Sequence, residues 1–166
     1  MRKNLLFFGI LFIGLSTRAQ QKNSGLEMGL GFGAGLYTGD YSSSLLNVTG
    51  NVEADYFINS QISIFGHLDY NRTFSTESAD AGSFGFATTH IGPRVHFAKV
   101  LFVGAGLGTI YTTGDGYSTW HFSYLPQVGA VLNHTELSFG YKGWATPYGN
   151  YGILELGVIF KLNRIH

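Results

Sequence analysis

The sequence contains no cysteine, few charged residues and no long helical hydrophobic segment. Without cysteine, the chain forms no disulfide and offers no thiol for lipoprotein acylation. Charged residues make up 12% of the chain, and no apolar stripe of helical period follows residue 20. These absences exclude a lipoprotein, a disulfide-stapled secreted domain and an α-helical fold. The chain has instead 24 glycines and 16% aromatic residues, a composition typical of many short strands and tight turns.

The N-terminus carries the features of an export signal. Two basic residues precede an apolar run over residues 5–15, and small residues follow up to Ala19. A run of about eleven apolar residues is short for a membrane-spanning helix, which needs roughly 20. The sequence therefore predicts a signal peptide over residues 1–19 and one domain over residues 20–166, with a membrane anchor as the alternative.

Removal of the predicted signal peptide makes the chain acidic. The full chain has 10 Lys and Arg against 10 Asp and Glu, and three of the basic residues, Arg2, Lys3 and Arg18, lie in the signal peptide. The remaining domain has a net charge of 7 − 10 = −3. A nucleic-acid-binding protein needs a basic surface, so this function is excluded.

Residues 25–40, GLEMGLGFGAGLYTGD, alternate large apolar side chains with glycine or polar residues. Successive side chains of a strand point to opposite faces, so this pattern predicts a strand with one apolar and one nearly bare face. Seven further segments repeat the alternation, and they begin near Val48, Ile62, Ala87, Leu101, Phe122, Leu137 and Leu154. The longer connections lie near residues 38–46, 75–83, 113–119 and 144–150.

The even strand number, the alternating long and short connections and the aromatic residues at strand ends favour a membrane barrel over a soluble sandwich. We predict an all-β fold, an eight-stranded antiparallel up-and-down transmembrane β-barrel, with the apolar face against lipid and the glycines facing the lumen. The glycines make room for inward residues such as Phe65, Phe102 and Leu125. Bulges are expected at Pro93 and Pro126, which remove ladder donors. A phosphate-binding glycine loop is excluded, because no helix or GK[ST] motif follows.

Residues 24–162 resemble the small eight-stranded outer-membrane barrels of Gram-negative bacteria, of the OmpA-domain, OmpX and opacity-protein type. This resemblance implies an integral, porin-like protein of the outer membrane that is surrounded by lipid and lipopolysaccharide and has no cofactor. The stretch Gly35 to Asp40 is also similar to a Y-x-G-D signature of PorG-like barrels, which are associated with type IX secretion. The chain departs from the family's terminal aromatic residue, because six residues follow Phe160, and it lacks a peptidoglycan-binding domain.

Several charged residues occupy inward positions of the predicted strands. The acidic ones are Glu27, Glu53, Asp55, Asp69, Glu136 and Glu155, and the basic ones are Arg94, Lys142, His67, His90 and His96. Charges in a narrow lumen persist only when they are paired, so we expect a network in which Arg94 meets Glu53 or Asp55. This network is interpreted as a plug that fixes the register, with a gate or proton path as the alternative.

The two rims of the predicted barrel differ in sign. With a periplasmic N-terminus, the outer loops carry Asp40, Glu77, Asp80 and Asp115 and no Lys or Arg. The inner rim is predicted to carry Lys22, Lys99, Lys161 and Arg164. Acidic loops can share divalent cations with lipopolysaccharide, and basic side chains can reach phospholipid headgroups. Docking of a partner protein is the alternative for both rims.

An enzymatic site is not predicted. His121 and Ser123 are similar to the H-x-S pair of lipid A deacylases, but Glu136 lies on the order of 30 Å away along the strand, too far for a triad. A metal site at His67, His90 or His96 is not predicted either, because the nearest spacing is six residues and no cysteine assists.

The sequence therefore favours a non-enzymatic accessory or structural subunit of an outer-membrane secretion or assembly complex. The partners would be outer-membrane or periplasmic proteins. The alternatives are a stand-alone barrier or lipid-interacting barrel and, with less support, a lipid A-modifying enzyme.

Overall fold

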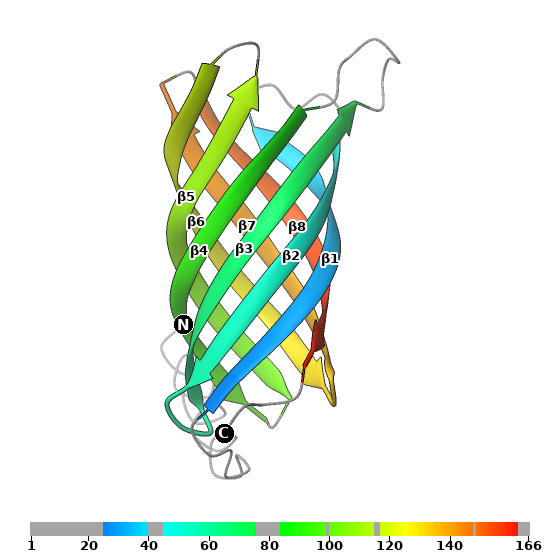
Figure 1. The fold of residues 1–166 in the computed structure, drawn as a ribbon, viewed down its shortest axis with the longest axis vertical. Helices are drawn as coiled ribbons and strands as arrows, with labels where there is room; N and C mark the ends of the chain where they lie inside the picture. The colour runs from blue at the N-terminus through cyan, green and yellow to red at the C-terminus, as the bar shows by residue number, and fades with distance from the viewer. Residues whose placement is uncertain are drawn as a thin grey trace, which may run out of the picture.

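The computed structural model describes residues 25–39, 45–75, 84–98, 100–114, 117–147 and 149–162. Within these ranges the chain forms eight antiparallel strands that close into one barrel, because β1 pairs with both β2 and β8 (Figure 1). The strands are β1 Gly25–Gly39, β2 Leu45–Phe57, β3 Ile62–Ser75, β4 Phe84–Phe97, β5 Leu101–Gly114, β6 Tyr117–Leu132, β7 Thr135–Thr146 and β8 Gly149–Lys161. The predicted fold class is confirmed. The predicted signal peptide lies outside the described residues.

The two ends of the barrel differ. β1 begins and β8 ends at one end, which we call the terminal end, and we call the opposite end the loop end (Figure 1). Among the described residues, no helix is long and apolar enough to cross a membrane.

Apolar side chains cover the outside of the barrel, and polar ones fill its interior. The outward residues Leu30, Phe32 and Leu36 of β1 are 55%, 58% and 62% exposed. In contrast, the inward residues Glu53 and Arg94 are 1% and 0% exposed. This distribution is the reverse of that in a soluble protein, where large apolar side chains form the core.

The inward glycines allow close packing inside the barrel, as predicted. A Cβ atom at Gly129 would lie 2.4 Å from the ring of Phe102, and one at Gly106 would lie 2.9 Å from the ring of Phe65. On β1, a Cβ at Gly35 would lie 2.7 Å from the side chain of Ile153 on β8. Because these distances leave no room for a side chain, the glycines let the barrel interior hold large residues from other strands.

The bulges expected at the two prolines do not occur. β4 and β5 pair Ile91 with Leu107 and then Arg94 with Gly104, and this is the same register on both sides of Pro93. Similarly, β6 and β7 pair Tyr124 with Gly143 and then Gln127 with Gly140 across Pro126. Each proline therefore interrupts one ladder without shifting it, because the missing N–H removes a bond but the extended backbone continues.

The four connections at the loop end are less uniform than predicted. The gaps between strands are residues 40–44, 76–83, 115–116 and 147–148. The third and fourth are therefore short turns, because residues 113–114 pair with 117–118 and residues 144–146 pair with 149–151. The predicted loops 113–119 and 144–150 are wrong in extent, since their threonine and aromatic residues continue the strands.

The turns at the terminal end use residues that suit tight backbones. Asn59 accepts hydrogen bonds from the N–H groups of Gln61 and Ile62 through its side-chain oxygen. Asn133 has a φ of 55°, in the left-handed region that asparagine tolerates, in the two-residue turn between β6 and β7. These turns join the strands that carry the inward charged residues.

Candidate functional site in the barrel interior

Arg94 on β4 lies at the centre of a group of acidic side chains near the terminal end. Its Nη1 donates to Glu53 at 3.0 Å, to Asp55 at 2.9 Å and to Glu136 at 3.1 Å. Its Nη2 donates to the second oxygen of Glu53 at 2.9 Å, so the Glu53 contact is bidentate. The structure thus brings Arg94 together with both acidic residues that the sequence analysis paired with it, and adds Glu136 from β7.

Lys161 on β8 enters the same group of carboxylates. Its Nζ lies 2.6 Å from Glu53, 2.8 Å from Asp55 and 2.8 Å from Glu136. We call these five residues the terminal cluster. The prediction that Lys161 lies on the inner rim for partner or lipid contact is wrong, because its side chain is 2% exposed and turned into the lumen. The physical reason is parity: Lys161 follows Ile159 at a spacing of two, which places both on the inner face.

Aromatic rings enclose the guanidinium group of Arg94. Its Cζ lies 4.1 Å from the ring centre of Phe102 and 4.8 Å from that of Phe65. Both rings are buried, at 1% and 0% exposure. Cation–π attraction adds to the ion pairs, and the rings keep water from the carboxylates.

A second group of charges lies between the terminal cluster and the loop end. Lys142 on β7 contacts Asp69 and Glu155, each at 2.9 Å, and donates to Asn71 at 3.3 Å. Thr49 donates to Glu155 at 2.8 Å. We call this group, with His67, the central cluster. It brings together Asp69 and Glu155, two of the residues expected to form a lumen network.

His67 joins the two clusters. Its Nδ1 lies 3.2 Å from Glu53 of the terminal cluster, and its Nε2 lies 3.2 Å from Asp69 of the central cluster. The contact of Nδ1 with Glu53 is a hydrogen bond, whereas Nε2 has no hydrogen-bond partner among the described residues and meets Asp69 by proximity alone. The inward charges of five strands therefore form one connected column along the barrel.

An aromatic plug closes the column at the loop end. Phe86, Ile110, Trp144 and Ile153 are buried together, and Tyr37 and Tyr151 pack against them. The ring of Trp144 lies 5.8 Å from Phe86 and 6.0 Å from Tyr151, centre to centre. The sequence analysis missed this plug because it placed Trp144 in a loop. Its inward parity with Lys142, two residues earlier, was the signal that could have found it.

The interior leaves little free space. A cavity of about 10 Å³ lies among His67, Gln127, Lys142 and Glu155, which is room for roughly one water molecule. The amide nitrogen of Gln127 has no hydrogen-bond partner among the described residues.

His121 and Ser123, the pair considered for catalysis, lie apart from Glu136: Ser123 pairs with Trp144 in the β6–β7 register, whereas Glu136 pairs with Val131, and His121 is only partly buried. Ser123 donates to the carbonyl of Gly143 at 3.1 Å, and its Oγ lies 2.9 Å from Nε2 of His90 on β4. His90, which the sequence analysis placed in the lumen network, has no described partner at Nδ1. Ser123 and His90 are both buried, at 0% and 3% exposure. In the part of the chain that the structure describes, no third group orients His90 as a triad would need.

The residues considered for metal binding have other partners. Glu53, Asp55 and Glu136 bring oxygen atoms within 4.8 Å of one another, but Arg94 and Lys161 already occupy the space between them. The histidines have different partners: His67 contacts Glu53, His90 contacts Ser123 and His96 contacts Ser63.

Glu27, one of the acidic residues expected at an inward position, lies at the start of β1 and is only partly buried.

Seven of the predicted rim residues lie outside the described residues. They are Lys22, Lys99 and Arg164 of the predicted inner rim and Asp40, Glu77, Asp80 and Asp115 of the predicted outer loops.

Among solved structures, the barrel is similar to Ail, the attachment invasion locus protein of Yersinia pestis. The crystal structure of Ail has a TM-score of 0.60 and 17% identity, over 84% of this chain and 100% of the Ail chain. The structure of Ail in a phospholipid bilayer nanodisc has a TM-score of 0.59 and 14% identity over the same shares. A complex of Ail with the heparin analogue sucrose octasulfate has a TM-score of 0.56 and 18% identity, over 85% and 100%.

No family model and no curated protein matches the chain. The similarity to Ail is one of fold, and it confirms the expected likeness to the small eight-stranded outer-membrane barrels.

Proposed function

We propose that the protein is an integral outer-membrane barrel that acts as a non-enzymatic, non-conducting structural subunit. Residues 1–19 direct its export and are removed. The observation that carries the proposal is the inverted barrel: an apolar outside around an interior filled by the two charged clusters and the aromatic plug.

The outside of the barrel supports a membrane location. Large apolar side chains that are around half exposed occur on every strand, for example Leu68 on β3 at 52%, Leu107 on β5 at 58% and Leu156 on β8 at 66%. A soluble monomer rarely exposes a contiguous apolar patch larger than a few hundred Å². Lipid is the solvent in which such a surface is stable, and a closed barrel leaves no unpaired strand edge in it.

The interior supports a structural role. A channel or gate needs a polar path, and the aromatic plug interrupts the polar column at the loop end. The burial of Ser123 and His90 does not support catalysis on lipid A. Lipid A with an unchanged acyl pattern in cells that overproduce the barrel is the result expected under this proposal.

For the wider role, we favour an accessory subunit of a secretion or assembly complex. The similarity of Gly35 to Asp40 to the Y-x-G-D signature of PorG-like barrels supports it. Three basic residues of the predicted inner rim, Lys22, Lys99 and Arg164, supply positive charge for a periplasmic partner. Lys161 does not contribute, because it belongs to the terminal cluster.

The second candidate is a stand-alone barrel that contacts lipid and lipopolysaccharide. The acidic residues of the connections at the loop end, including Asp40 and Asp80, favour shared divalent cations with lipopolysaccharide phosphates. Ail was crystallised with a sulfated sugar. The loop-end connections of this chain carry no Lys or Arg, so we do not extend that ligand to it.

An affinity pull-down from detergent-solubilised membranes tests the subunit role. The tagged wild type is compared with a variant in which Lys22, Lys99 and Arg164 are replaced by Gln, and both are first checked for recovery in the outer-membrane fraction. A defined partner that is retained by the wild type and lost by the variant supports the subunit. Recovery of the barrel alone from both samples would refute the subunit role and favour the second candidate, the stand-alone barrel.

A further inference from the structure

The outward wall of the barrel carries one charged side chain in the part of the chain that the structure describes, and it belongs to Arg72 on β3. Every other Asp, Glu, Lys or Arg of the described strands takes an inward position. The neighbours of Arg72 along the chain, Asn71 and Thr73, are buried in the lumen, so Arg72 points to the opposite face and is exposed. A charged side chain on the lipid face of a barrel is costly in the middle of the membrane and tolerated near the headgroups.

Arg72 lies close to the loop end of the barrel. β3 ends at Ser75, and the register partners of Arg72 are Val48 near the start of β2 and Gly85 near the start of β4. The outward side chain of Phe74, next to it on the same strand, is 42% exposed, and aromatic residues of this kind mark the membrane interface. Because an arginine side chain is long and flexible, its guanidinium group can extend along the wall to the level of the lipid headgroups.

Tyr70 places a hydroxyl group beside Arg72. Its side chain also points outward from β3, and its ring leans across to β4: a Cβ atom at Gly85 would lie 3.0 Å from Cζ of Tyr70 and closer still to the hydroxyl oxygen. Gly85 is also the residue that pairs with Arg72. The arginine and the tyrosine hydroxyl thus adjoin the same glycine on the outside of the barrel, where both offer hydrogen-bond donors.

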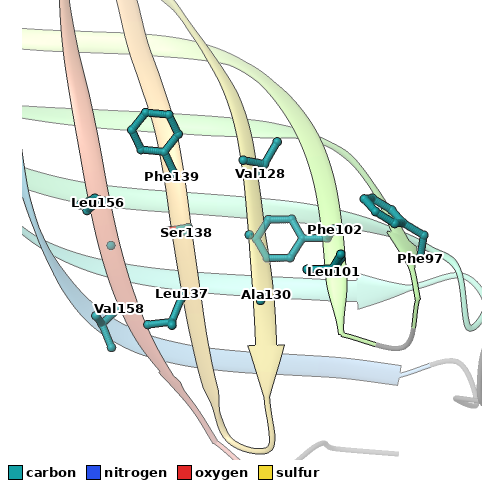
Figure 2. A pocket seen from close by; sticks show the side chains of 12 residues that line it. Phe97, Leu101, Phe102, Val128, Ala130, Leu137, Ser138, Phe139, Leu156 and Val158 are labelled. Atoms are coloured by element: carbon teal, nitrogen blue, oxygen red, sulfur yellow. The ribbon is translucent and has the colours of Figure 1, made fainter. Parts of the chain in front are cut away.

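The wall repeats this tyrosine packing at another place without an arginine. Tyr141 on β7 lies over Gly152 on β8, and the residue that pairs with Gly152 is Gly143. A hollow of about 580 Å³ over β5 to β8 is also lined without any charged side chain (Figure 2). Acyl chains can cover these places, whereas the combination of Arg72 and Tyr70 is suited to an anionic oxygen group. This chemical difference separates the Arg72 site from the rest of the lipid-facing wall.

We infer that Arg72 and Tyr70 bind a phosphate group of a lipid headgroup in the leaflet at the loop end. This inference rests on the proposed membrane location and adds a specific anion site to it. A guanidinium group can donate two parallel hydrogen bonds to phosphate oxygens, and the tyrosine hydroxyl can donate a third. The phosphate can be a monoester, as in lipid A, or a diester, as in a glycerophospholipid. The exposed apolar neighbours Val48 and Phe74 favour a lipid over the carboxylate of a partner protein, because they need hydrocarbon around them.

Lipid retention, measured by native mass spectrometry, tests the inference. The full chain is refolded in phosphatidylcholine vesicles that contain a small fraction of lipid A and is then extracted in a mild detergent. The fraction of barrels that retain lipid A is compared between variants as the lipid A content is raised. R72Q is expected to lower the affinity for lipid A about tenfold, because it removes a charged hydrogen-bond donor. Y70F removes one neutral donor and is expected to lower the affinity about 2- to 5-fold.

Two variants are matched controls. Y141F removes the hydroxyl group of the tyrosine that has no arginine beside it, and its retention of lipid A should equal that of the wild type. R72Q/I62R keeps the net charge and moves the guanidinium group to the other end of β3, where Ile62 points outward and is 40% exposed. This variant should stay as weak as R72Q. Resistance to heat unfolding on a gel confirms that each variant is folded before it is compared.

The choice of lipid separates the phosphate from the rest of the headgroup. The wild type should retain lipid A without phosphate groups as weakly as R72Q retains complete lipid A. Phosphatidylglycerol in place of lipid A tests the diester: retention that equals that of lipid A and falls in R72Q supports the site and assigns it to glycerophospholipids.

Four outcomes would overturn the inference. Equal retention of lipid A by the wild type and R72Q, or of lipid A with and without phosphate by the wild type, means that Arg72 only contacts bulk lipid. Full recovery in R72Q/I62R means that any outward charge near a headgroup is enough. A partner protein that the wild type captures and R72Q loses, with unchanged lipid retention, identifies a carboxylate as the anion. Failure to enter vesicles would refute the membrane location itself, and this is distinct because no variant is then recovered with the vesicles.

Discussion

Replacing Arg94 with alanine is expected to cost the barrel a large part of its stability. The change removes four hydrogen bonds to Glu53, Asp55 and Glu136 and leaves Lys161 as the one Lys or Arg that contacts these three carboxylates among the described residues. Breaking a buried ion pair from one side costs about 3–5 kcal/mol, because the remaining charge is left without compensation. Because three carboxylates lose a partner at once, we expect R94A to fall within that range.

Two related variants separate the causes of this loss. R94K keeps the positive charge but loses the bidentate contact with Glu53 and the planar stacking on Phe65 and Phe102, so we expect a smaller loss of about 1–3 kcal/mol. Adding Glu136→Gln to R94A removes one uncompensated charge and should recover part of the stability. R72A is the matched control, because Arg72 points outward on β3 and is exposed, and its loss should stay below about 1 kcal/mol.

The assay is urea unfolding of the refolded barrel in lipid vesicles, followed by tryptophan fluorescence. The chain has two tryptophans, Trp144 in the aromatic plug and Trp120 on the outside at 66% exposure, so interior and lipid contact are both reported. A loss below about 1 kcal/mol in R94A would refute the reasoning, because it would mean that water or rearranged side chains replace the guanidinium group.

Three further predictions follow from the same interior. Planar-bilayer recordings should show no stable channel for the wild type. W144A should show none either, because the charged clusters still fill the lumen behind the plug. Steady openings in W144A would mean that the plug alone closes the barrel. K161M should lower the free energy of unfolding by about 3 kcal/mol or more, measured by the same urea titration, and an unchanged midpoint would mean that Lys161 is hydrated. G35A should lower the free energy of unfolding by about 1–3 kcal/mol, because the added Cβ would lie 2.7 Å from both Ile153 and a backbone oxygen. In the control variant G50A the added Cβ has no atom within 4 Å, so this change should be neutral or slightly stabilising. Equal unfolding midpoints for the two variants would contradict the packing argument.

The sequence predicted the strands well because lipid and lumen impose opposite demands on alternate residues. Residues 25–39 show both demands in one run, and their alternation places Leu30 outside and Gly31 inside, as observed. The pairing of Arg94 with its neighbours on β2 followed from parity and from the cost of unpaired buried charge.

The membership of the terminal cluster could not be predicted in full from the sequence. Glu136 reaches Arg94, and Lys161 reaches the carboxylates around Arg94, because the strands tilt and stagger around the barrel, and parity alone does not give that stagger. The sequence analysis assigned Lys161 to the rim because it lies near the end of the last strand. The extent of the third and fourth loops was also wrong, since glycine and proline near residues 114 and 147 mark tight turns as well as long loops.

The composition of the terminal cluster has a consequence for the order of assembly. Its acidic side chains come from β2 and β7, and its two basic ones come from β4 and from the last residue of β8. Lys161 therefore reaches Glu53 and Asp55 only when β8 meets β1 and the ring is complete. Until that moment the unfinished sheet carries an excess of negative charge on its concave side, which favours keeping that side in water. The final closure brings the second cation to Glu53 and Asp55, so lowering the negative charge of the interior and sealing the wall are one step.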